Sequence, residues 1–291
     1  MILGKYLIGA AFLAPITHTA LAQAPTAPLV VDTPMVHDPV MAFEDGKYYL
    51  YCTGHGITQL TSTDRRHWTV KPDGVLPVGK IPAWTRDSVP GFDTHIWAPD
   101  VIKYGDKWYL TYSCSTFGKN TSAIGLLSNT SLANADGWKD EGCVVASKGD
   151  RDNWNAIDPN IIVDKKGNPW MTWGSFWDGI QMVQLDRTMH VKRGAKPFTI
   201  ARRHAEGDTN VEPNPTSQFA GTNAIEAPFI IQHGGYYYLF VSWDYCCRLE
   251  EQLPCSGGQK QEGGGSVPRP QRQGHASGWR HYRHPRRQAR V

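Results

Sequence analysis

A unit of about 60 residues recurs along the chain, and this repeat restricts the folds that the chain can adopt. Each copy has a proline, then a short apolar segment, a tight polar turn and an aromatic segment. The prolines stand at positions 39, 99, 159 and 228, so their spacings are 60, 60 and 69 residues. The aromatic segments are 48–51, 108–112, 170–173 and 236–240. Repeats of this length indicate an array of similar structural units.

Within each unit, two short apolar segments joined by a glycine-containing turn predict a β-hairpin. Further strand candidates, such as 122–127 and 179–185, follow the hairpins and give about four strands per unit. No long segment has a helical period. We therefore predict an all-β fold of the β-propeller type. A β-sandwich is the competing all-β fold, but it gives no reason for an acid at the same point of successive units.

Three acidic residues, Asp38, Asp158 and Glu226, lie at or next to the residue that precedes a repeated proline. The innermost strand of every propeller blade lines a central channel, so these acids would face each other at one mouth of it. Because proline steers the residue before it towards an extended backbone, we expect fixed directions for Asp38 and Asp158. A turn is the usual role of a single Asp–Pro pair. The complete set favours three carboxylates that converge on one catalytic centre.

Residues 1–22 are typical of a secretory signal, with Lys5 before a short apolar run and small residues at a cleavage site. The apolar run is too short to span a bilayer, and an ordinary buried helix is the alternative. We expect an exported protein, extracellular or periplasmic, with a linker at 23–34 and an incomplete propeller domain at 35–248. The six cysteines fix neither a disulfide pattern nor a zinc site.

The last segment, 249–291, differs from the rest of the chain. It has eight Lys or Arg and three Glu, whereas the whole chain has a net charge of +3, so the remainder carries −2. It has only four Leu, Ile, Val or Phe residues, too few to bury an apolar core. We expect a disordered or out-of-frame tail after about four blades, and a weakly active or insoluble protein, because open repeat arrays expose strand edges. A basic tail that binds acidic polysaccharide is the alternative.

Five short motifs, each weak alone, occur in a specific order at the spacing of the blades. They are His37–Pro39, Trp97–Asp100, Asn155–Asn160, Gly174–Trp177 and Glu226–Phe229. With them, the segment from Val36 to Arg248 resembles the family 43 glycoside hydrolases, and within these the endo-1,5-α-L-arabinanases. The resemblance implies a five-bladed propeller that hydrolyses internal α-1,5-L-arabinofuranosidic bonds of arabinan with inversion.

By this resemblance, Asp38 is the general base, Glu226 is the general acid, and Asp158 orients the acid and raises its pKa. Inverting hydrolysis needs two carboxyl groups roughly 6.5–9.5 Å apart, with room for the attacking water between them. A neighbouring carboxylate makes ionisation of Glu226 less favourable, so the acid can stay protonated near neutral pH. Asp100 is expected to be structural.

Further residues are expected to contact the sugar through ring stacking, hydrogen bonds or close backbone approach. The predicted substrate-binding residues are Trp97, Gly118, Asn155, Ala156, Ile157, Ser175, Phe176 and Trp177. Packing inside the core is the alternative for each aromatic ring. The sequence has no metal-binding motif, and a calcium ion is implied by the resemblance alone.

Three functions remain open from the sequence. The first is an endo-arabinanase whose partner is linear arabinan. The second is an α-L-arabinofuranosidase or β-xylosidase of the same family. The third is a non-catalytic propeller that binds glycans. We expect a monomer with neither a nucleic-acid nor a membrane partner, because the basic excess is confined to the tail.

Overall fold

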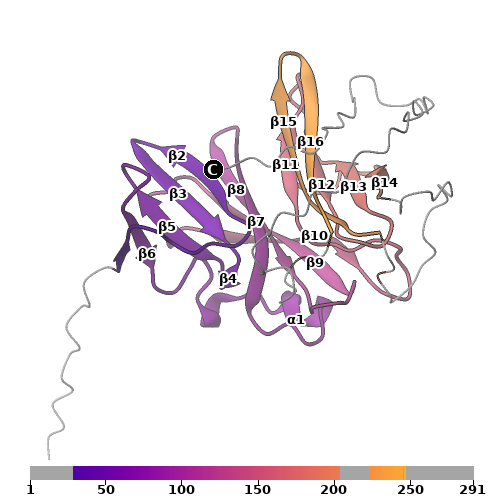
Figure 1. Cartoon of the computed structure of the whole chain (residues 1–291), viewed down its shortest axis with the longest axis horizontal. Coiled ribbons are helices and arrows are strands. Elements are labelled where there is room, and N and C mark those ends of the chain that lie inside the picture. Colours follow the sequence, from indigo (N-terminus) through magenta and orange to yellow (C-terminus); the bar gives the residue numbers. More distant parts are fainter. Residues whose placement is uncertain (1–28, 204–219, 221–222, 245, 247–291) are drawn as a thin grey trace, which may run out of the picture.

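The computed structural model describes residues 29–203, 220, 223–244 and 246, and the statements below refer to these. Four antiparallel sheets, here called blades 1 to 4, follow one another along the chain (Figure 1). Helical structure is limited to η1 (Val78–Lys80) and α1 (Trp84–Ser88) within this part. No helix in it is long and apolar enough to cross a membrane.

Blades 1 and 2 have five strands each. Blade 1 has the order β1 (Val30–Val31), β6 (Trp68–Lys71), β5 (Thr58–Ser62), β3 (Lys47–Cys52) and β2 (Val40–Glu44). Blade 2 has the order β10 (Lys139–Ser147), β9 (Ser122–Asn129), β8 (Lys107–Cys114), β7 (His95–Tyr104) and β4 (Gly54–His55).

The described parts of blades 3 and 4 are smaller. Blade 3 has the order β11 (Asn160–Val163), β12 (Pro169–Trp173), β13 (Ile180–Gln184) and β14 (Phe198–Ala201). Blade 4 pairs β15 (Ile225–His233) with β16 (Tyr236–Trp243). The aromatic segments of the repeat are β3, β8, β12 and β16, and the strand candidates at 122–127 and 179–185 are β9 and β13, so these predictions are confirmed.

The hairpin turns explain why the strands are antiparallel neighbours. Asp45 and Gly46 connect β2 and β3 as a two-residue loop, and both have positive φ, as a type I′ turn requires. Gly234 and Gly235 do the same between β15 and β16. These local signals are what made the hairpins visible in the sequence.

Apolar side chains of neighbouring blades pack together and form most of the core. The contact between blades 1 and 2 includes Tyr51, Leu110 and Tyr112, that between blades 2 and 3 includes Ile124, Met171 and Trp173, and that between blades 3 and 4 includes Met182, Ile230 and Tyr237. Burial of one such side chain stabilises the fold by about 1.5–3 kcal/mol. The blades are therefore held face to face by the repeated aromatic and aliphatic positions.

The strands β2, β7, β11 and β15 contact one another in that order and are the inner strands of the four blades. Between their starting points lies a cavity of ≈ 180 Å³, which all four repeated prolines line. Inner strands around a central channel are the arrangement of a β-propeller. The predicted all-β, propeller-type fold is therefore confirmed.

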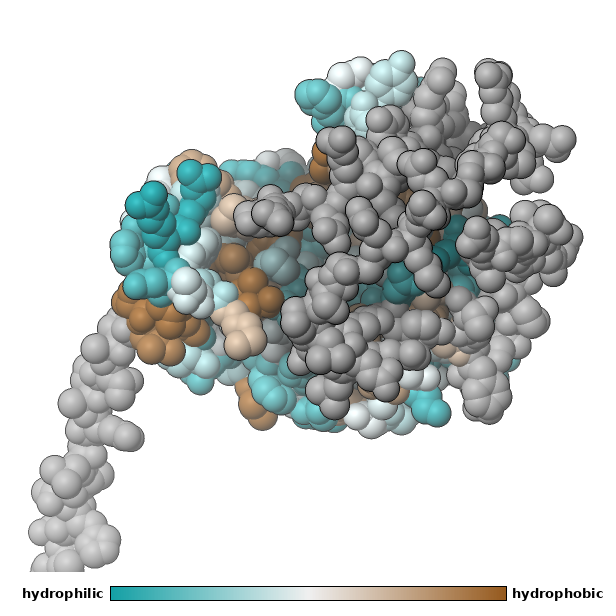
Figure 2. Space-filling view, in the orientation of Figure 1, coloured by the Kyte–Doolittle hydropathy of each residue, from teal (hydrophilic) through white to brown (hydrophobic). Residues whose placement is uncertain are grey.

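Apolar side chains are exposed at both ends of this series of blades. Met41 and Phe43 of β2 are exposed, and so are Phe229 and Phe240, which are cross-strand partners in blade 4. Figure 2 shows hydrophobic residues gathered over blade 1, at the left of the view. Within the described residues, these are the faces against which a further element could pack and bury apolar area.

The structure tests one of the segment boundaries expected from the sequence. The linker predicted at 23–34 is too long, because Val30 and Val31 pair with β6 as the outer strand of blade 1. The signal at 1–22 and the tail at 249–291 lie outside the described residues. Cys52, Cys114 and Cys143 are free thiols, and Cys246 is disulfide-bonded.

Candidate active site

The four residues that directly precede the repeated prolines share a left-handed backbone. Their φ angles are +51° at Asp38, +38° at Ala98, +57° at Asp158 and +52° at Ala227. The prediction that proline would hold Asp38 and Asp158 in an extended conformation is therefore wrong. Non-glycine residues adopt positive φ rarely and at a cost, so its recurrence at four equivalent positions indicates a requirement of the fold.

The physical reason is a bulge at the start of the inner strand. In blade 2 the ladder skips from Trp97 to Asp100, and in blade 4 it skips from Glu226 to Phe229. A proline cannot donate to a ladder, so a bulge is where a strand can accommodate it. The bulge turns the preceding residue and re-aims its side chain.

Hydrogen bonds between blades hold three of these left-handed residues in place. The backbone N–H of Ala98 donates to Thr53 Oγ1 over 2.9 Å, and that of Asp158 donates to Ser113 Oγ over 3.0 Å. The N–H of Ala227 donates to Asp158 Oδ2 over 3.1 Å. In each case the acceptor belongs to the preceding repeat, so the packing of two blades fixes the turn.

The repeat thus offers two kinds of side-chain position at the channel mouth. In blades 1 and 3 the acid is the left-handed residue itself, whereas in blade 4 Glu226 stands one residue earlier. Trp97 has the corresponding earlier position in blade 2. This equivalence makes Trp97 a candidate for the same site as the acids.

Asp38 is anchored through one carboxylate oxygen. Its Oδ2 accepts a hydrogen bond of 2.6 Å from Thr53 Oγ1 and lies 2.8 Å from Nδ1 of His37. The side chain is 32% exposed, and Oδ1 has no partner in the part of the chain that the structure describes. A carboxylate that is oriented at one oxygen and open at the other suits a general base, which must take a proton from water.

Asp158 connects blade 3 to the segment that contains the second acid. Burial raises the pKa of Asp158 well above its usual range, and the charges of Glu226 and Asp38 raise it further. Its hydrogen bond to the Ala227 N–H opposes this rise. Asp158 is therefore a carboxyl group whose ionisation is disfavoured in the folded protein.

Glu226 is half-buried, and its Oε2 accepts a hydrogen bond of 2.9 Å from Ser175 Oγ. Burial raises the pKa of Glu226; the Ser175 bond opposes the rise, and the charge of Asp38 adds to it. The contribution of Asp158 to this rise stays a prediction; the two groups interact electrostatically, and the ionisation of Asp158 is itself disfavoured. A raised pKa keeps the carboxyl group protonated at higher pH, as a general acid requires.

A third aspartate, Asp100, lines the central cavity together with Asp38 and Asp158. Its Oδ2 accepts hydrogen bonds from the N–H of Ile161 over 2.7 Å and from Nδ2 of Asn160 over 3.2 Å. Burial raises the pKa of Asp100 to about 6. Its carboxylate bonds across from blade 2 to blade 3, which agrees with the structural role expected of it.

Two predicted substrate residues lie in exposed or half-buried positions. Trp97 is half-buried, and its Nε1 donates to Nδ1 of His95 over 2.9 Å. Gly118 has φ +74°, and open space surrounds the place of a Cβ, so conformation rather than close approach explains the glycine. Its neighbour Phe117 is 79% exposed, which the sequence did not single out.

Three other predicted residues come from the segment before Asp158 and are buried. Asn155 Oδ1 accepts a hydrogen bond of 2.7 Å from Ser122 Oγ. Ala156 lies in the core between blades 2 and 3, and Ile157 is buried as well. Any contact of Ala156 or Ile157 with a substrate would have to come through their backbone.

The remaining predicted residues, Ser175, Phe176 and Trp177, form one turn next to Glu226. Ser175 is buried, and its hydroxyl donates to Glu226 Oε2; its contact with a sugar stays a prediction. Phe176 is half-buried, and Trp177 is only 3% exposed. Trp177 therefore packs inside the protein.

Sequence reasoning missed Thr53 and His95, which orient Asp38 and Trp97. Thr53 is 15 residues from Asp38, and His95 lies two residues before Trp97 in β7; neither carries a motif of its own. Among the described residues, no three His, Cys, Asp or Glu side chains gather as a metal site. The calcium ion implied by the resemblance finds no ligand set among these residues.

Comparison with known proteins places this geometry in a wider context. The model for the glycosyl hydrolases family 43 matches residues 29–263. The chain is 44% identical over 216 residues to an extracellular exo-α-(1→5)-L-arabinofuranosidase of Cellvibrio japonicus, which covers 73% of this chain and 60% of the relative. It is 40% identical over 243 residues to an extracellular endo-α-(1→5)-L-arabinanase of Bacillus subtilis, with 82% of this chain and 68% of the relative covered.

Solved structures give the same picture. An exo-1,5-α-L-arabinanase from a bovine ruminal metagenomic library is 54% identical, with a TM-score of 0.66, over 75% of this chain and 67% of that one. The Cellvibrio cellulosa α-L-arabinanase complexed with arabinohexaose is 42% identical, with a TM-score of 0.64, over 73% and 66%. The chain thus spans 60% of the length of the first curated relative and about two thirds of these structures.

Proposed function

The chain belongs to glycosyl hydrolases family 43, and on this premise we propose that it is an arabinan-cleaving hydrolase. In the proposed reaction, Asp38 takes a proton from a water molecule that attacks the anomeric carbon. Glu226 gives its proton to the leaving oxygen. Asp158 holds the segment that carries Glu226. The anomeric centre of an α-linked arabinofuranosyl unit would be inverted.

The observation that carries the proposal is that Asp38 and Glu226 lie in different environments. Asp38 has one anchored oxygen and one open oxygen. Glu226 is half-buried, with a pKa raised mainly by burial. An oriented carboxylate with one open oxygen, together with a carboxyl group whose ionisation is disfavoured, is the equipment of acid–base catalysis. The relatives named as arabinanases support arabinan as the substrate.

The first test is to incubate the protein with linear 1,5-arabinan and to measure reducing ends and product sizes. We expect short oligomers before arabinose if the enzyme acts internally. Proton NMR of the earliest product should show the β-anomer, because a single displacement inverts the α-linkage. An early α-anomer would contradict the proposed roles.

Two substitutions separate the base from the acid. Asp38→Asn should lower kcat by about 10²–10⁴-fold on every substrate, because the attacking water loses its base. Glu226→Gln should lower kcat to a similar extent on arabinan but far less on 4-nitrophenyl α-L-arabinofuranoside, because that leaving group needs little protonation. Asp106→Asn, in the exposed β7–β8 turn, is the control and should retain full activity.

Exo action is the second candidate, and a specific observation favours it. The 54% identical structure and the 44% identical relative are both named as exo enzymes. Arabinose or one short oligomer, released from the start without a fall in polymer size, would identify exo action. A parallel incubation with xylo-oligomers would exclude a β-xylosidase if they remain uncleaved.

Export and a monomeric state belong to the proposal as well. Two relatives are named extracellular, which supports export. N-terminal sequencing of protein recovered outside the cytoplasm tests it, and the expected new N-terminus follows residue 22. Size-exclusion chromatography with light scattering tests the monomer.

A further inference from the structure

The turn next to Glu226 has an unusual backbone. Phe176 has φ +57° and Trp177 has φ +41°, so two successive bulky residues adopt the left-handed conformation. The turn closes through a hydrogen bond of 2.7 Å from the Gly179 N–H to the Phe176 carbonyl. Such a backbone persists only where surrounding contacts fix it. The contacts that stabilise this backbone therefore indicate the role of the turn.

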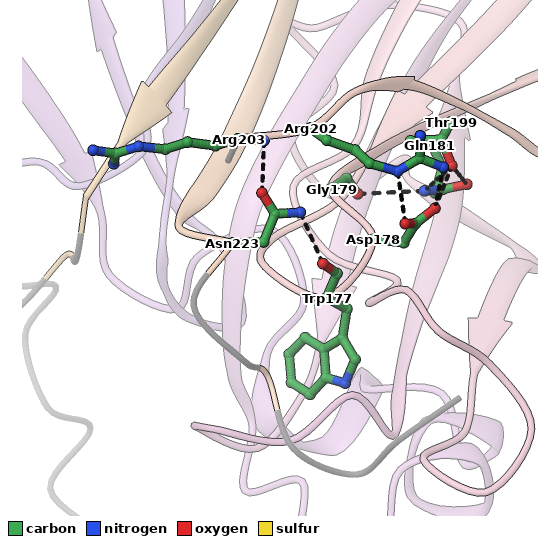
Figure 3. Close-up of polar contacts among 8 residues, drawn as sticks. All are labelled: Trp177, Asp178, Gly179, Gln181, Thr199, Arg202, Arg203 and Asn223. Atoms are coloured by element: carbon green, nitrogen blue, oxygen red, sulfur yellow. Dashed lines mark hydrogen bonds and ion pairs between the residues drawn. The ribbon is translucent and has the colours of Figure 1, made fainter. Parts of the chain in front are cut away.

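A buried ion pair holds one end of the turn. Arg202 donates to Asp178 through Nε over 2.7 Å and through Nη2 over 2.9 Å, and Thr199 Oγ1 donates to the same carboxylate over 2.6 Å (Figure 3). The Asp178 side chain is 4% exposed and that of Arg202 is 26% exposed. A two-point contact of this kind fixes direction as well as distance. Asp178 is thereby tied to the residue that follows β14.

An amide holds the middle of the turn. Nδ2 of Asn223 donates to the Trp177 carbonyl over 2.8 Å, and its Oδ1 accepts the N–H of Arg203 over 2.6 Å (Figure 3). Asn223 is buried and lies three residues before Glu226. The turn is therefore fixed both to β14 and to the chain that enters β15.

The other side of the turn touches the acid. The Phe176 N–H donates to the Ile225 carbonyl over 2.9 Å, directly before Glu226. The Ser175 hydroxyl donates to Glu226 Oε2 over 2.9 Å. A shift of the turn would therefore move the backbone beside Glu226 and the Ser175 hydroxyl that bonds its carboxyl group.

We propose that Asp178, paired with Arg202, is a positioning residue for the proton donor. The pair fixes the Ser175–Gly179 turn, and the turn fixes the rotamer and the hydrogen bonding of Glu226. This inference rests on the proposed role of Glu226 as general acid. Asp178 does not act on the substrate, and its effect passes through Ser175.

The test is kinetics on linear arabinan as a function of pH, with Asp178→Asn and Ser175→Ala. The Ser175 bond favours the ionised form of Glu226, so its loss raises the pKa of the acid. Both variants should therefore move the basic limb of the kcat/KM profile upward, by about 1 pH unit for Ser175→Ala. Asp178→Asn should also lower kcat by about 10–100-fold with little change in KM, because the acid is misplaced.

Two further variants separate positioning from a loss of stability. Glu44→Gln changes a carboxylate that bonds Trp108, Ser131 and Leu132 far from the acids, and it should leave the pH profile unchanged. Arg202→Lys keeps the charge but loses the two-point contact, so it should show the limb shift even if Asp178→Asn does not fold. An unchanged basic limb and kcat in folded Asp178→Asn or Arg202→Lys would overturn the inference. No cleavage by the unmodified protein would instead overturn the proposed function.

Discussion

Replacement of Asp100 by asparagine is expected to stabilise the protein at neutral pH. Asp100 is buried beside the central cavity, and burial raises its pKa from 3.8 to about 6. A group with a raised pKa contributes stability that is complete below its unfolded pKa and lost as pH rises through its folded pKa. The charged form of Asp100 is therefore a cost to the folded protein at pH 7.

The size of this cost follows from the shift. One pKa unit corresponds to about 1.4 kcal/mol, so ionisation of Asp100 costs about 3 kcal/mol at pH 7 and less than about 1 kcal/mol at pH 4. Asparagine can place Oδ1 where Asp100 Oδ2 accepts the Ile161 N–H and Asn160 Nδ2. It loses the bond to the Val101 N–H, which removes about 1 kcal/mol at either pH. The variant should therefore gain about 2 kcal/mol relative to the natural protein between pH 4 and pH 7.

Urea unfolding followed by tryptophan fluorescence, at pH 4, 5.5 and 7, measures this difference. Asp164→Asn is a control of opposite sign, because hydrogen bonds from Asn168, Trp170 and the Lys166 N–H outweigh burial and lower the pKa of Asp164. Its stabilising effect is present above the unfolded pKa, so that variant should be less stable at pH 7 and recover as pH falls. If Asp100→Asn gains nothing between pH 4 and pH 7, the reasoning about its buried charge is wrong.

Two further predictions concern residues that orient the site. Thr53→Val removes the hydroxyl that bonds Asp38 Oδ2 and the Ala98 N–H, and it should lower kcat about tenfold, whereas Thr53→Ser should retain activity; initial rates on arabinan decide this. His95→Phe leaves Trp97 Nε1 without its acceptor and should raise KM several-fold with a smaller change in kcat, whereas His95→Gln restores an acceptor; equal KM values for the two variants would contradict the role.

The strands could be predicted because their signals are local. A glycine-containing turn between two apolar segments needs only a few neighbouring residues, so β2–β3 and β15–β16 were visible in the sequence. The repeat then supplied what local reasoning lacks, since equal spacing places equivalent residues of different blades around one axis. The repeat therefore predicts the three acids at one channel mouth; Asp38 and Asp158 line the central cavity, and Ala227, the residue after Glu226, lines it too.

The backbone at the acids could not be predicted, because the interactions that determine it are not local. Local sterics before a proline favour an extended residue, whereas at Ala98, Asp158 and Ala227 a hydrogen bond from another blade holds the left-handed turn. Thr53 and Ser113 supply such bonds 60 residues apart, yet neither stands in a motif. The turn at Phe176 and Trp177 was likewise hidden, because it depends on Arg202 and on Asn223.

Asp158 bonds the backbone beside Glu226 and also carries a titratable group near it, which gives a reason for an acid at this position. In blades 2 and 3 the left-handed residue is held by a hydroxyl of the preceding blade, whereas in blade 4 the acceptor for Ala227 is the Asp158 carboxylate. The atom that fixes the backbone beside Glu226 is therefore part of a titratable group that is itself buried near Glu226 and Asp38. A hydroxyl at this position would accept the same backbone hydrogen bond but would add no titratable group. Asp158 thus combines in one side chain the hydrogen bond that holds the backbone beside the proposed proton donor and an electrostatic interaction with Glu226.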